Sequence, residues 1–251
     1  MTDKQLNIMV FTDNEFIYDN FITIIKDKKL HKAHNFTYAC SISNDAFEKN
    51  DSVKKLRISE HVDSLIDKYD LIISCHSKQV FPAKLVNSIR CINIHPGLNP
   101  YNRGWYPQVF SIINKKPLGA TIHEMDEQID HGSIIVQKDI KLNSWDTSIT
   151  AYNKVIQAEV ELLKKSVNDI IYGTYLATPM LNEGNYNSKQ DFNDLCKLDL
   201  KEKTTLREVI DKLRALTHGE YSNAYYIDEH SNKIFIKISL EKASNKSDNK
   251  T

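Results

Sequence analysis

The chain has 251 residues, 41% hydrophobic and 26% charged, which is the composition of an ordinary globular protein. Its 33 Lys and Arg residues balance its 33 Asp and Glu residues, so no overall field favours nucleic acid or an anionic membrane. This length suits one large domain, or one domain with a small appendage.

The N-terminal stretch and the cysteines indicate where the protein acts. The stretch MTDKQLNIMVFTD has no long apolar run, so we expect neither a secretory signal nor a membrane span there. The cysteines lack the spacing of metal ligands and lie mostly in apolar, strand-like segments. We therefore expect a cytoplasmic protein with reduced thiols and no metal site, its four cysteines being Cys40, Cys75, Cys91 and Cys196.

The first part of the chain alternates buried strands with amphipathic segments. Apolar runs predict strands over 6–12, 36–41 and 71–75, and a helix over 15–26 follows the plausible capping pair Asp13-Asn14. The polar stretch 44–68 predicts one or two further helices. This alternation predicts an α/β fold with a doubly wound, mostly parallel sheet. The turn TDNE carries no glycine-rich or Walker-type loop, which argues against dinucleotide and ATP sites of those kinds.

The rest of the chain predicts a second set of elements and a small terminal unit. We expect a short helix over 82–89, a strand over 91–95, a helix over 108–114, strands over 118–125 and 133–140, and a helix over 148–172. A helix over 206–216, capped by Thr204 or Thr205, would precede a hairpin of 223–228 and 233–239. The predicted division is a catalytic domain over 1–180, a linker over 181–203, a C-terminal unit over 204–240 and a disordered tail over 241–251.

The stretch 91–106, CINIHPGLNPYNRGWY, carries the strongest chemical signal. In a strand, Asn93 and His95 project to one face while Ile92 and Ile94 anchor the other face in the core. An amide and an imidazole then meet where a strand ends, which is where open α/β sheets bind ligands. The alternative is that His95 is a hydrogen-bonded histidine that merely ends a strand.

Asp130, in the loop QIDHG, can join this pair. A carboxylate could orient and charge-balance the His95 imidazole, and the Asn93 amide could donate to a developing oxyanion, an effect of about 2.7–4 kcal/mol. The sequence Asp-His-Gly also suits an ordinary turn, so an entirely structural role for Asp130 stays open.

The combined motif resembles the formyltransferase family that uses N10-formyltetrahydrofolate. It consists of Asn93-x-His95-Pro96-Gly97, then Pro100-x-x-Arg103-Gly104, then Asp130-x-Gly132. The extended form HPGLNPYNRGWYPQVFSIIN is most similar to the sugar-nucleotide N-formyltransferases, particularly those acting on dTDP-4-amino-4,6-dideoxyglucose for surface polysaccharides such as O-antigen. The resemblance covers about residues 6–175 and implies the Rossmann-like formyltransferase fold.

The resemblance implies that Asn93, His95 and Asp130 are catalytic. Asn93 and protonated His95 would stabilise the oxyanion, and His95 or a water held by Asp130 would take the amine proton. The folate would bind between the loop 77–81 and the segment 125–130. The implied residues are Ser77, Lys78, Gln79, Val80, Phe81, Met125, Asp126 and Ile129, although Lys78 could equally be a solvated lysine.

The same resemblance implies a nucleotide-sugar site. It would use Pro100, Tyr101, Asn102, Arg103, Gly104, Trp105 and Tyr106, together with Arg214, Tyr221 and Asn223 from the C-terminal unit. Arg103 suits phosphate or a structural carboxylate equally well, and Trp105 could be a core residue. Tyr221 could stack on a base or pack in a hairpin or dimer. The sugar enzymes pair through such a unit, so a homodimer is expected.

Two other enzymes of the formyltransferase family would need features that this sequence lacks. A methionyl-tRNA enzyme needs a larger basic C-terminal domain, and a glycinamide ribonucleotide enzyme needs a Gly/Ser-rich loop in place of TDNEF. Transfer to a dTDP-3-amino or UDP-4-amino sugar, hydrolysis of the formyl-folate, and a catalytically silent binding module remain alternatives to the dTDP-4-amino sugar.

Overall fold

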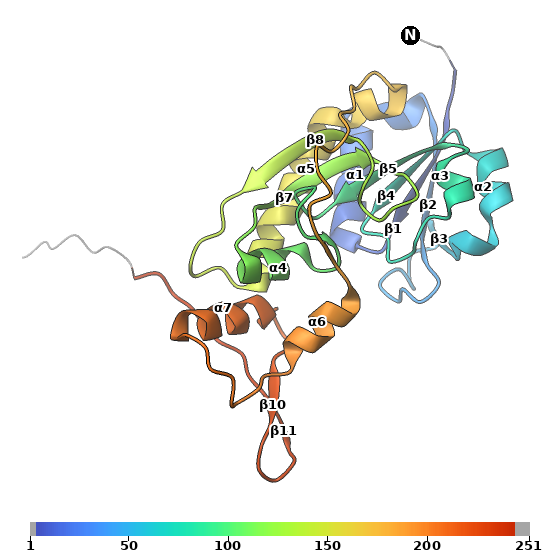
Figure 1. Cartoon of the computed structure of the whole chain (residues 1–251). Helices are drawn as coiled ribbons and strands as arrows, with labels where there is room; N and C mark the ends of the chain where they lie inside the picture. The colour runs from blue at the N-terminus through green and yellow to red at the C-terminus, as the bar shows by residue number, and fades with distance from the viewer. Residues whose placement is uncertain (1–3, 244–251) are drawn as a thin grey trace, which may run out of the picture.

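A seven-stranded mixed sheet forms the centre of the computed structural model, which describes residues 4–243 (Figure 1). The strand order is β3-β2-β1-β4-β5-β7-β8, in which β3 to β5 are parallel and β7 and β8 are antiparallel to their neighbours. The strands are β1 (Asn7–Thr12), β2 (Asn35–Ser41), β3 (Val53–Leu56), β4 (Leu71–Cys75), β5 (Arg90–His95), β7 (Leu118–Glu124) and β8 (Ile134–Ile140).

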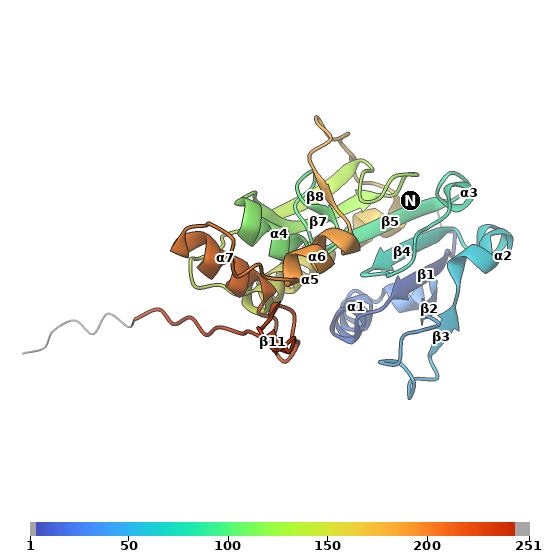
Figure 2. The ribbon, with the colours of Figure 1, turned by 60° about the horizontal axis from the view of Figure 1, so that its bottom comes forward.

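Helices cover both faces of this sheet (Figure 2). Ile8 and Val10 of β1 pack in one apolar cluster with α1 (Glu15–Asp27) and α5 (Ser148–Tyr172). Met9 and Phe11, which alternate with them, pack in a second cluster with side chains of two short helices, α2 (Val62–Lys68) and α3 (Ala83–Val86). Because successive side chains of a strand point to opposite faces, the sheet has an apolar core on each side. The expected α/β fold with a mostly parallel sheet is confirmed.

The edge strand β3 was not anticipated. The polar stretch 44–68 was expected to be helical, but it contains the edge strand β3 and a 3₁₀ turn (Ile58–Glu60) before α2; a second 3₁₀ turn (Leu30–Lys32) follows α1. The sequence of β3, VKKL, has two exposed lysines between a buried valine and a half-buried leucine. Exposed lysines of this kind protect the edge of a sheet from pairing with another strand. Because of them, β3 lacks the apolar run by which a central strand is recognised in the sequence.

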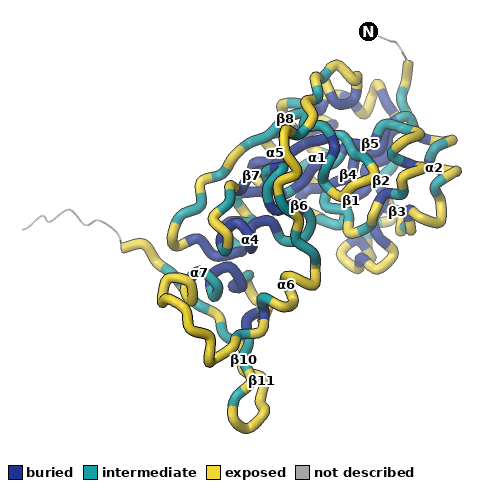
Figure 3. Tube along the Cα trace, viewed as in Figure 1, coloured by how far each residue is buried: buried dark blue, intermediate teal, exposed yellow. Residues whose placement is uncertain are grey.

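The C-terminal part packs against α4 (Pro107–Asn114) and extends away from the sheet (Figures 1 and 3). It contains α7 (Leu206–Leu216), capped by Thr205, and a hairpin of β10 (Tyr225–Ile227) and β11 (Lys233–Phe235). These elements agree with the expected helix and hairpin.

The segment 181–203, expected to be a linker, contains regular structure. It forms β9 (Tyr186–Asn187), which pairs with β6 (Arg103–Gly104), and α6 (Lys189–Cys196). Cys196 is buried in the same cluster as α4 and α7, so this segment belongs to the packed molecule. Of the tail expected to be disordered, residues 244–251 lie outside the described residues. Within 4–243, no helix is long and apolar enough to cross a membrane.

Candidate active site

Asn93 and His95 lie at the carboxyl end of β5, between β4 and β7. The imidazole of His95 is almost completely buried, with 4% of its side chain exposed. The intervening Ile92 and Ile94 are buried in the cluster with α1 and α5 on the opposite face. This strand therefore presents two polar side chains on one face because its apolar residues occupy the other.

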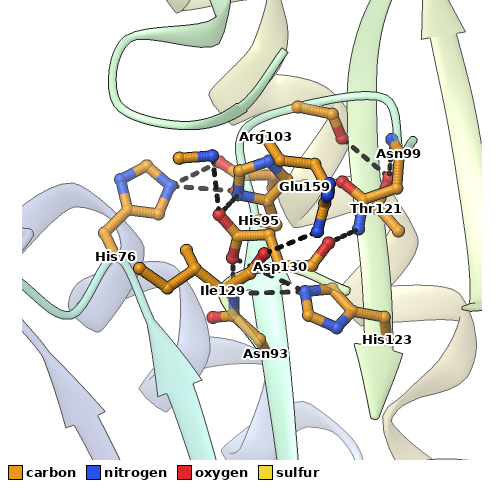
Figure 4. Close-up of polar contacts among 12 residues, drawn as sticks. His76, Asn93, His95, Asn99, Arg103, Thr121, His123, Ile129, Asp130 and Glu159 are labelled. Atoms are coloured by element: carbon orange, nitrogen blue, oxygen red, sulfur yellow. Dashed lines mark hydrogen bonds and ion pairs between the residues drawn. The ribbon is translucent and has the colours of Figure 1, made fainter. Parts of the chain in front are cut away.

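Asp130 is held against both side chains by the turn that joins β7 to β8 (Figure 4). Its Oδ1 accepts a hydrogen bond from Asn93 Nδ2 at 2.9 Å, and its Oδ2 lies 3.4 Å from His95 Nδ1. The backbone N–H of Gly104 donates to Oδ2 at 3.0 Å, and Asn99 Nδ2 donates to the Asp130 carbonyl at 2.8 Å. Asp130 has a left-handed backbone (φ 50°), the kind of strain that surrounding contacts must maintain.

His123 completes the cluster and was missed by the sequence analysis. It lies on β7 directly opposite Asn93, with its Nε2 3.3 Å from Asn93 Nδ2 and 3.8 Å from Asp130 Oδ1. Its Nδ1 is 2.6 Å from the carbonyl oxygen of Glu124, to which it donates, and this leaves Nε2 as the acceptor. The run LGATIHE shows that His123 is in a strand, but only the register with β5 brings it to Asn93.

Burial and the neighbouring charges set the protonation of this cluster. Burial lowers the pKa of His95 to about 4, although the Asp130 carboxylate opposes that shift. Burial alone would raise the pKa of Asp130, but the adjacent His95 and the Gly104 N–H outweigh it and hold that pKa well below its usual range. His95 is therefore neutral near pH 7, which differs from the protonated imidazole expected from the sequence.

The two ring nitrogens of His95 have different surroundings. Nδ1 faces the Asp130 carboxylate, whereas Nε2 is buried and has no hydrogen-bond partner within residues 4–243. Gly97 is essential to this arrangement because a Cβ at that position would lie 2.3 Å from Nε2. A neutral imidazole with an unpartnered Nε2 can accept a proton from a bound reactant.

The expected cofactor loop 77–81 lies next to this centre, after β4. The Gln79 side chain points inward, where it bonds the backbone of Leu56 and Ile58, while Lys78 and Val80 are exposed. The remaining residues expected to bind the cofactor differ in exposure: Phe81 is buried, Ser77, Met125 and Asp126 are half-buried, and the Ile129 side chain is exposed.

Asp13 holds the loop 77–81 through a hydrogen bond from Lys78. The sequence analysis anticipated Asp13 only as a helix-capping residue. Asn14 is the residue that caps α1. The Asp13 carboxylate instead accepts hydrogen bonds from the N–H and hydroxyl of Ser41, from Asn44 Nδ2 and from the backbone N–H of Lys78. It therefore connects the ends of β1, β2 and β4, a role that only the sheet order reveals.

The expected sugar segment 100–106 borders the cluster but uses several side chains internally. Asn102 is buried among Ser111, Asn114, Asn185 and Asn187, to all of which its side chain is hydrogen-bonded. Arg103 donates to the Ile129 carbonyl and pairs with Glu183 at 3.6 Å. Pro100, Tyr101, Gly104, Trp105 and Tyr106 are half-buried, so they remain candidates for ligand contacts.

The C-terminal candidates do not converge on the cluster. Arg214 is buried, and its guanidinium bonds Asp211 and the carbonyls of Asn143 and Asp146 through Nε and Nη1, so these contacts anchor α7. Asn223 Nδ2 donates to the Leu216 carbonyl. Tyr221 is 70% exposed and contacts the His218 ring, which leaves its outer face open. Among residues 4–243, no group of three or more His, Cys, Asp or Glu side chains could hold a metal ion.

Comparison with known proteins shows which family this chain belongs to. The model of the family described as formyl transferase matches residues 7–167, and the N-formyltransferase dimerization C-terminal domain matches residues 191–242. The dTDP-4-amino-4,6-dideoxyglucose formyltransferase of Mycobacterium tuberculosis is 45% identical over 189 residues, which is 75% of this chain and 81% of the relative.

Two solved structures share almost the whole architecture. A 4-N formyltransferase from Francisella tularensis superimposes with a TM-score of 0.91 at 51% identity, covering 95% of this chain and 99% of its own. A sugar N-formyltransferase from a Shewanella species gives a TM-score of 0.91 at 41% identity, with the same coverage of both chains.

Proposed function

Because the chain belongs to the formyl transferase family, we propose that it transfers a formyl group from N10-formyltetrahydrofolate to the amine of a dTDP-linked 4-amino-4,6-dideoxy sugar. The activities named for the Mycobacterium and Francisella relatives support the 4-amino position. The proposal places the product in O-antigen or other surface polysaccharide synthesis. It places the reaction in the cytoplasm, where the four buried, free cysteines would stay reduced.

The unpartnered Nε2 of His95 is the observation that carries this proposal. A buried polar atom without a partner is costly, so Nε2 indicates a group that a ligand satisfies. Gly97 packs closely against this nitrogen, because a Cβ at that position would lie only 2.3 Å from Nε2. The formyl donor supplies a carbonyl carbon that an amine can attack, and a neutral imidazole beside that carbon fits the proton transfer that such an attack requires.

Within this proposal, His95 moves the proton and Asp130 balances the charge. His95 Nε2 accepts a proton from the attacking amine, and the Asp130 carboxylate stabilises the charge that forms on the ring. His95 can then return the proton from Nε2 to the departing nitrogen, which restores the neutral ring. The geometry of a carboxylate on Nδ1 also holds the tautomer that leaves Nε2 free.

Asn93 has a double role in the proposal. Its two amide N–H groups donate to Asp130 at 2.9 Å and to His123 at 3.3 Å. The longer contact is the weaker one, so it is the one that can be exchanged for an oxygen with developing negative charge. Such a donor contributes about 2.7–4 kcal/mol to a transition state. His123 would then keep the free amide aligned before the ligand binds.

The proposed oligomer is a homodimer that pairs through the C-terminal unit. The dimerization domain matched over residues 191–242 supports this, together with exposed apolar side chains on α7 and the hairpin. Besides the second copy of the chain, the proposed ligands are the nucleotide sugar and the folate.

Product formation from N10-formyltetrahydrofolate and matched dTDP sugars tests the reaction. We expect turnover with the amine at C4, little with the amine at C3 or with a UDP-4-amino sugar, and a loss of about 10²–10⁴-fold in His95→Asn. Faster turnover of the C3 or UDP sugar would change the substrate. Folate deformylation at the same rate without any sugar would instead identify a hydrolase, and tight folate binding without turnover would identify a binding module.

A further inference from the structure

A second acid–base pair lies beside His95 and belongs to none of the groups described above. It consists of His76, the first residue after β4, and Glu159, in the middle of α5. His76 Nε2 lies 2.9 and 2.8 Å from the two carboxylate oxygens of Glu159 (Figure 4). Since Cys75 of β4 is in register with Ile94 of β5, the residues that follow them, His76 and His95, lie at the same end of these two strands.

The burial of Glu159 makes this pair more than a surface contact. None of its side chain is exposed, and His76 is the hydrogen-bond partner of its carboxylate among residues 4–243. A buried carboxylate in an otherwise apolar helix face is costly, and removing its partner leaves an uncompensated group. Burial raises the pKa of Glu159, and the His76 ring opposes that shift.

His76 is also fixed from its other side. Its Nδ1 lies 3.3 Å from the hydroxyl of Tyr152, and Asn14 Nδ2 donates to that hydroxyl at 2.9 Å. His76 has a left-handed backbone (φ 59°), which costs free energy for a residue other than glycine. The contacts with α5 therefore hold the first residue of the loop 76–81 in a conformation that it would not adopt alone.

We propose that Glu159 and His76 form a positioning pair that holds the loop 76–81 in the shape that receives the formyl donor beside His95. The proposal rests on the proposed function. Asp13, after β1, supports the later part of the loop by accepting from Lys78, and Gln79 ties it to Ile58, after β3. The His76–Glu159 pair supports the beginning of the loop from α5. The loop is thus organised before the ligand arrives, which reduces the entropic cost of binding.

Two variants and a control test this pair. Glu159→Gln keeps the volume and removes the charge, while His76→Asn suits a left-handed position and removes the ring. Glu161→Gln is the matched control, because Glu161 lies two residues along the same helix and pairs with Lys138 on its exposed side. Binding of folinic acid would be measured by calorimetry, and KM for both substrates by steady-state assay.

We expect the folinic acid Kd and the donor KM to rise about tenfold in both test variants, with the sugar KM within about twofold of wild type. The double variant should bind folinic acid no more weakly than the single variant with the higher Kd, because both changes break the same interaction. Amides of residues 77–81 should exchange faster with solvent, whereas Glu161→Gln should match wild type. If Glu159→Gln does not fold, His76→Asn carries the test.

An unchanged donor KM and Kd with only a lower melting temperature would make the pair purely structural and overturn the inference. An equal rise in the sugar KM would overturn it as well, because the effect would not be specific to the donor loop. Wild-type protein that neither binds folinic acid nor forms product would overturn the proposed function itself. The wild-type measurement therefore separates the two failures.

Discussion

His95 combines deep burial with a ring nitrogen that has no hydrogen-bond partner among residues 4–243. Burial keeps the ring neutral, and the Asp130 carboxylate orients it, so the residue is ready to accept a proton but does not hold one at rest. The consequence is a cost in stability that depends on pH, since the unfolded chain protonates this histidine near its ordinary pKa of about 6.5.

We expect stability to decrease as the pH falls from about 6.5 to 4. In this window the unfolded state binds a proton at His95 that the folded state does not, so acidification favours unfolding by up to about 3 kcal/mol. Burial also lowers the pKa of His34 and His218, which adds to the same trend. Denaturant unfolding at pH 7.5 and 4.5 should give a smaller pH-dependent loss in His95→Asn than in wild type. An identical loss in both proteins would contradict a depressed pKa for His95.

We expect Gly97→Ala to inactivate the enzyme while the fold persists. The new Cβ would lie 2.3 Å from His95 Nε2 and 3.2 Å from Pro107 Cγ, so the imidazole must move. A displacement of about 1 Å at a reacting group can cost about 10²-fold in rate. Gly219→Ala is the control: its backbone is left-handed but a Cβ there meets nothing within 4 Å, so it should lose stability and keep activity. Comparable kcat values for both variants would refute the role of Gly97.

At the scale of elements, the site is built around the carboxyl ends of the parallel strands. The ends of β1, β2 and β4 are joined through Asp13, and β5 is joined to the antiparallel β7 through Asn93 and His123. The parallel strands bring their carboxyl ends to one edge of the sheet, which is where open α/β sheets bind ligands. The support of each loop by buried acceptors explains how polar loops keep one conformation over an apolar core.

We expect Asp13→Ala to lower stability by about 2–4 kcal/mol, because four donors lose their acceptor. Asp13→Asn should recover only part of that loss, since an amide nitrogen cannot accept. Asp19→Asn, an exposed change on α1, is the control and should leave the free energy of unfolding within about 0.5 kcal/mol. Chemical denaturation measures all three, and an Asp13→Ala protein as stable as Asp19→Asn would exclude the anchoring role.

At the scale of the whole molecule, the C-terminal unit leaves apolar side chains without cover. Leu206, Val209 and Ile210 of α7 and Ile227, Ile234 and Phe235 of the hairpin are exposed in a single chain. The unit projects away from the sheet, so these side chains do not serve the catalytic core (Figure 3). A stable dimer interface buries about 1,200–2,000 Å² in total, and apolar clusters of this kind are its usual centre.

We expect the protein to have about twice its chain mass of 29.0 kDa when light scattering is measured during gel filtration. Phe235→Asp should shift it towards the monomer, because a charge would be buried in the interface. Leu176→Asp, an equally drastic change at an exposed leucine outside the unit, should remain dimeric. A wild-type protein with the mass of one chain would refute the dimer.

By itself, the sequence determined the order of most elements, the placement of Asn93 and His95 on one face of a strand, and the resemblance to the formyltransferases. These follow from local periodicity and from short motifs at fixed spacing along the chain, which need no knowledge of distant contacts. Only the tertiary structure decided that His123 meets Asn93, that Arg214 serves α7, that Asp13 supports three strands, and that His95 is neutral. Strand register, burial and partners 28 or more residues away set these properties, and none of them leaves a local pattern in the sequence.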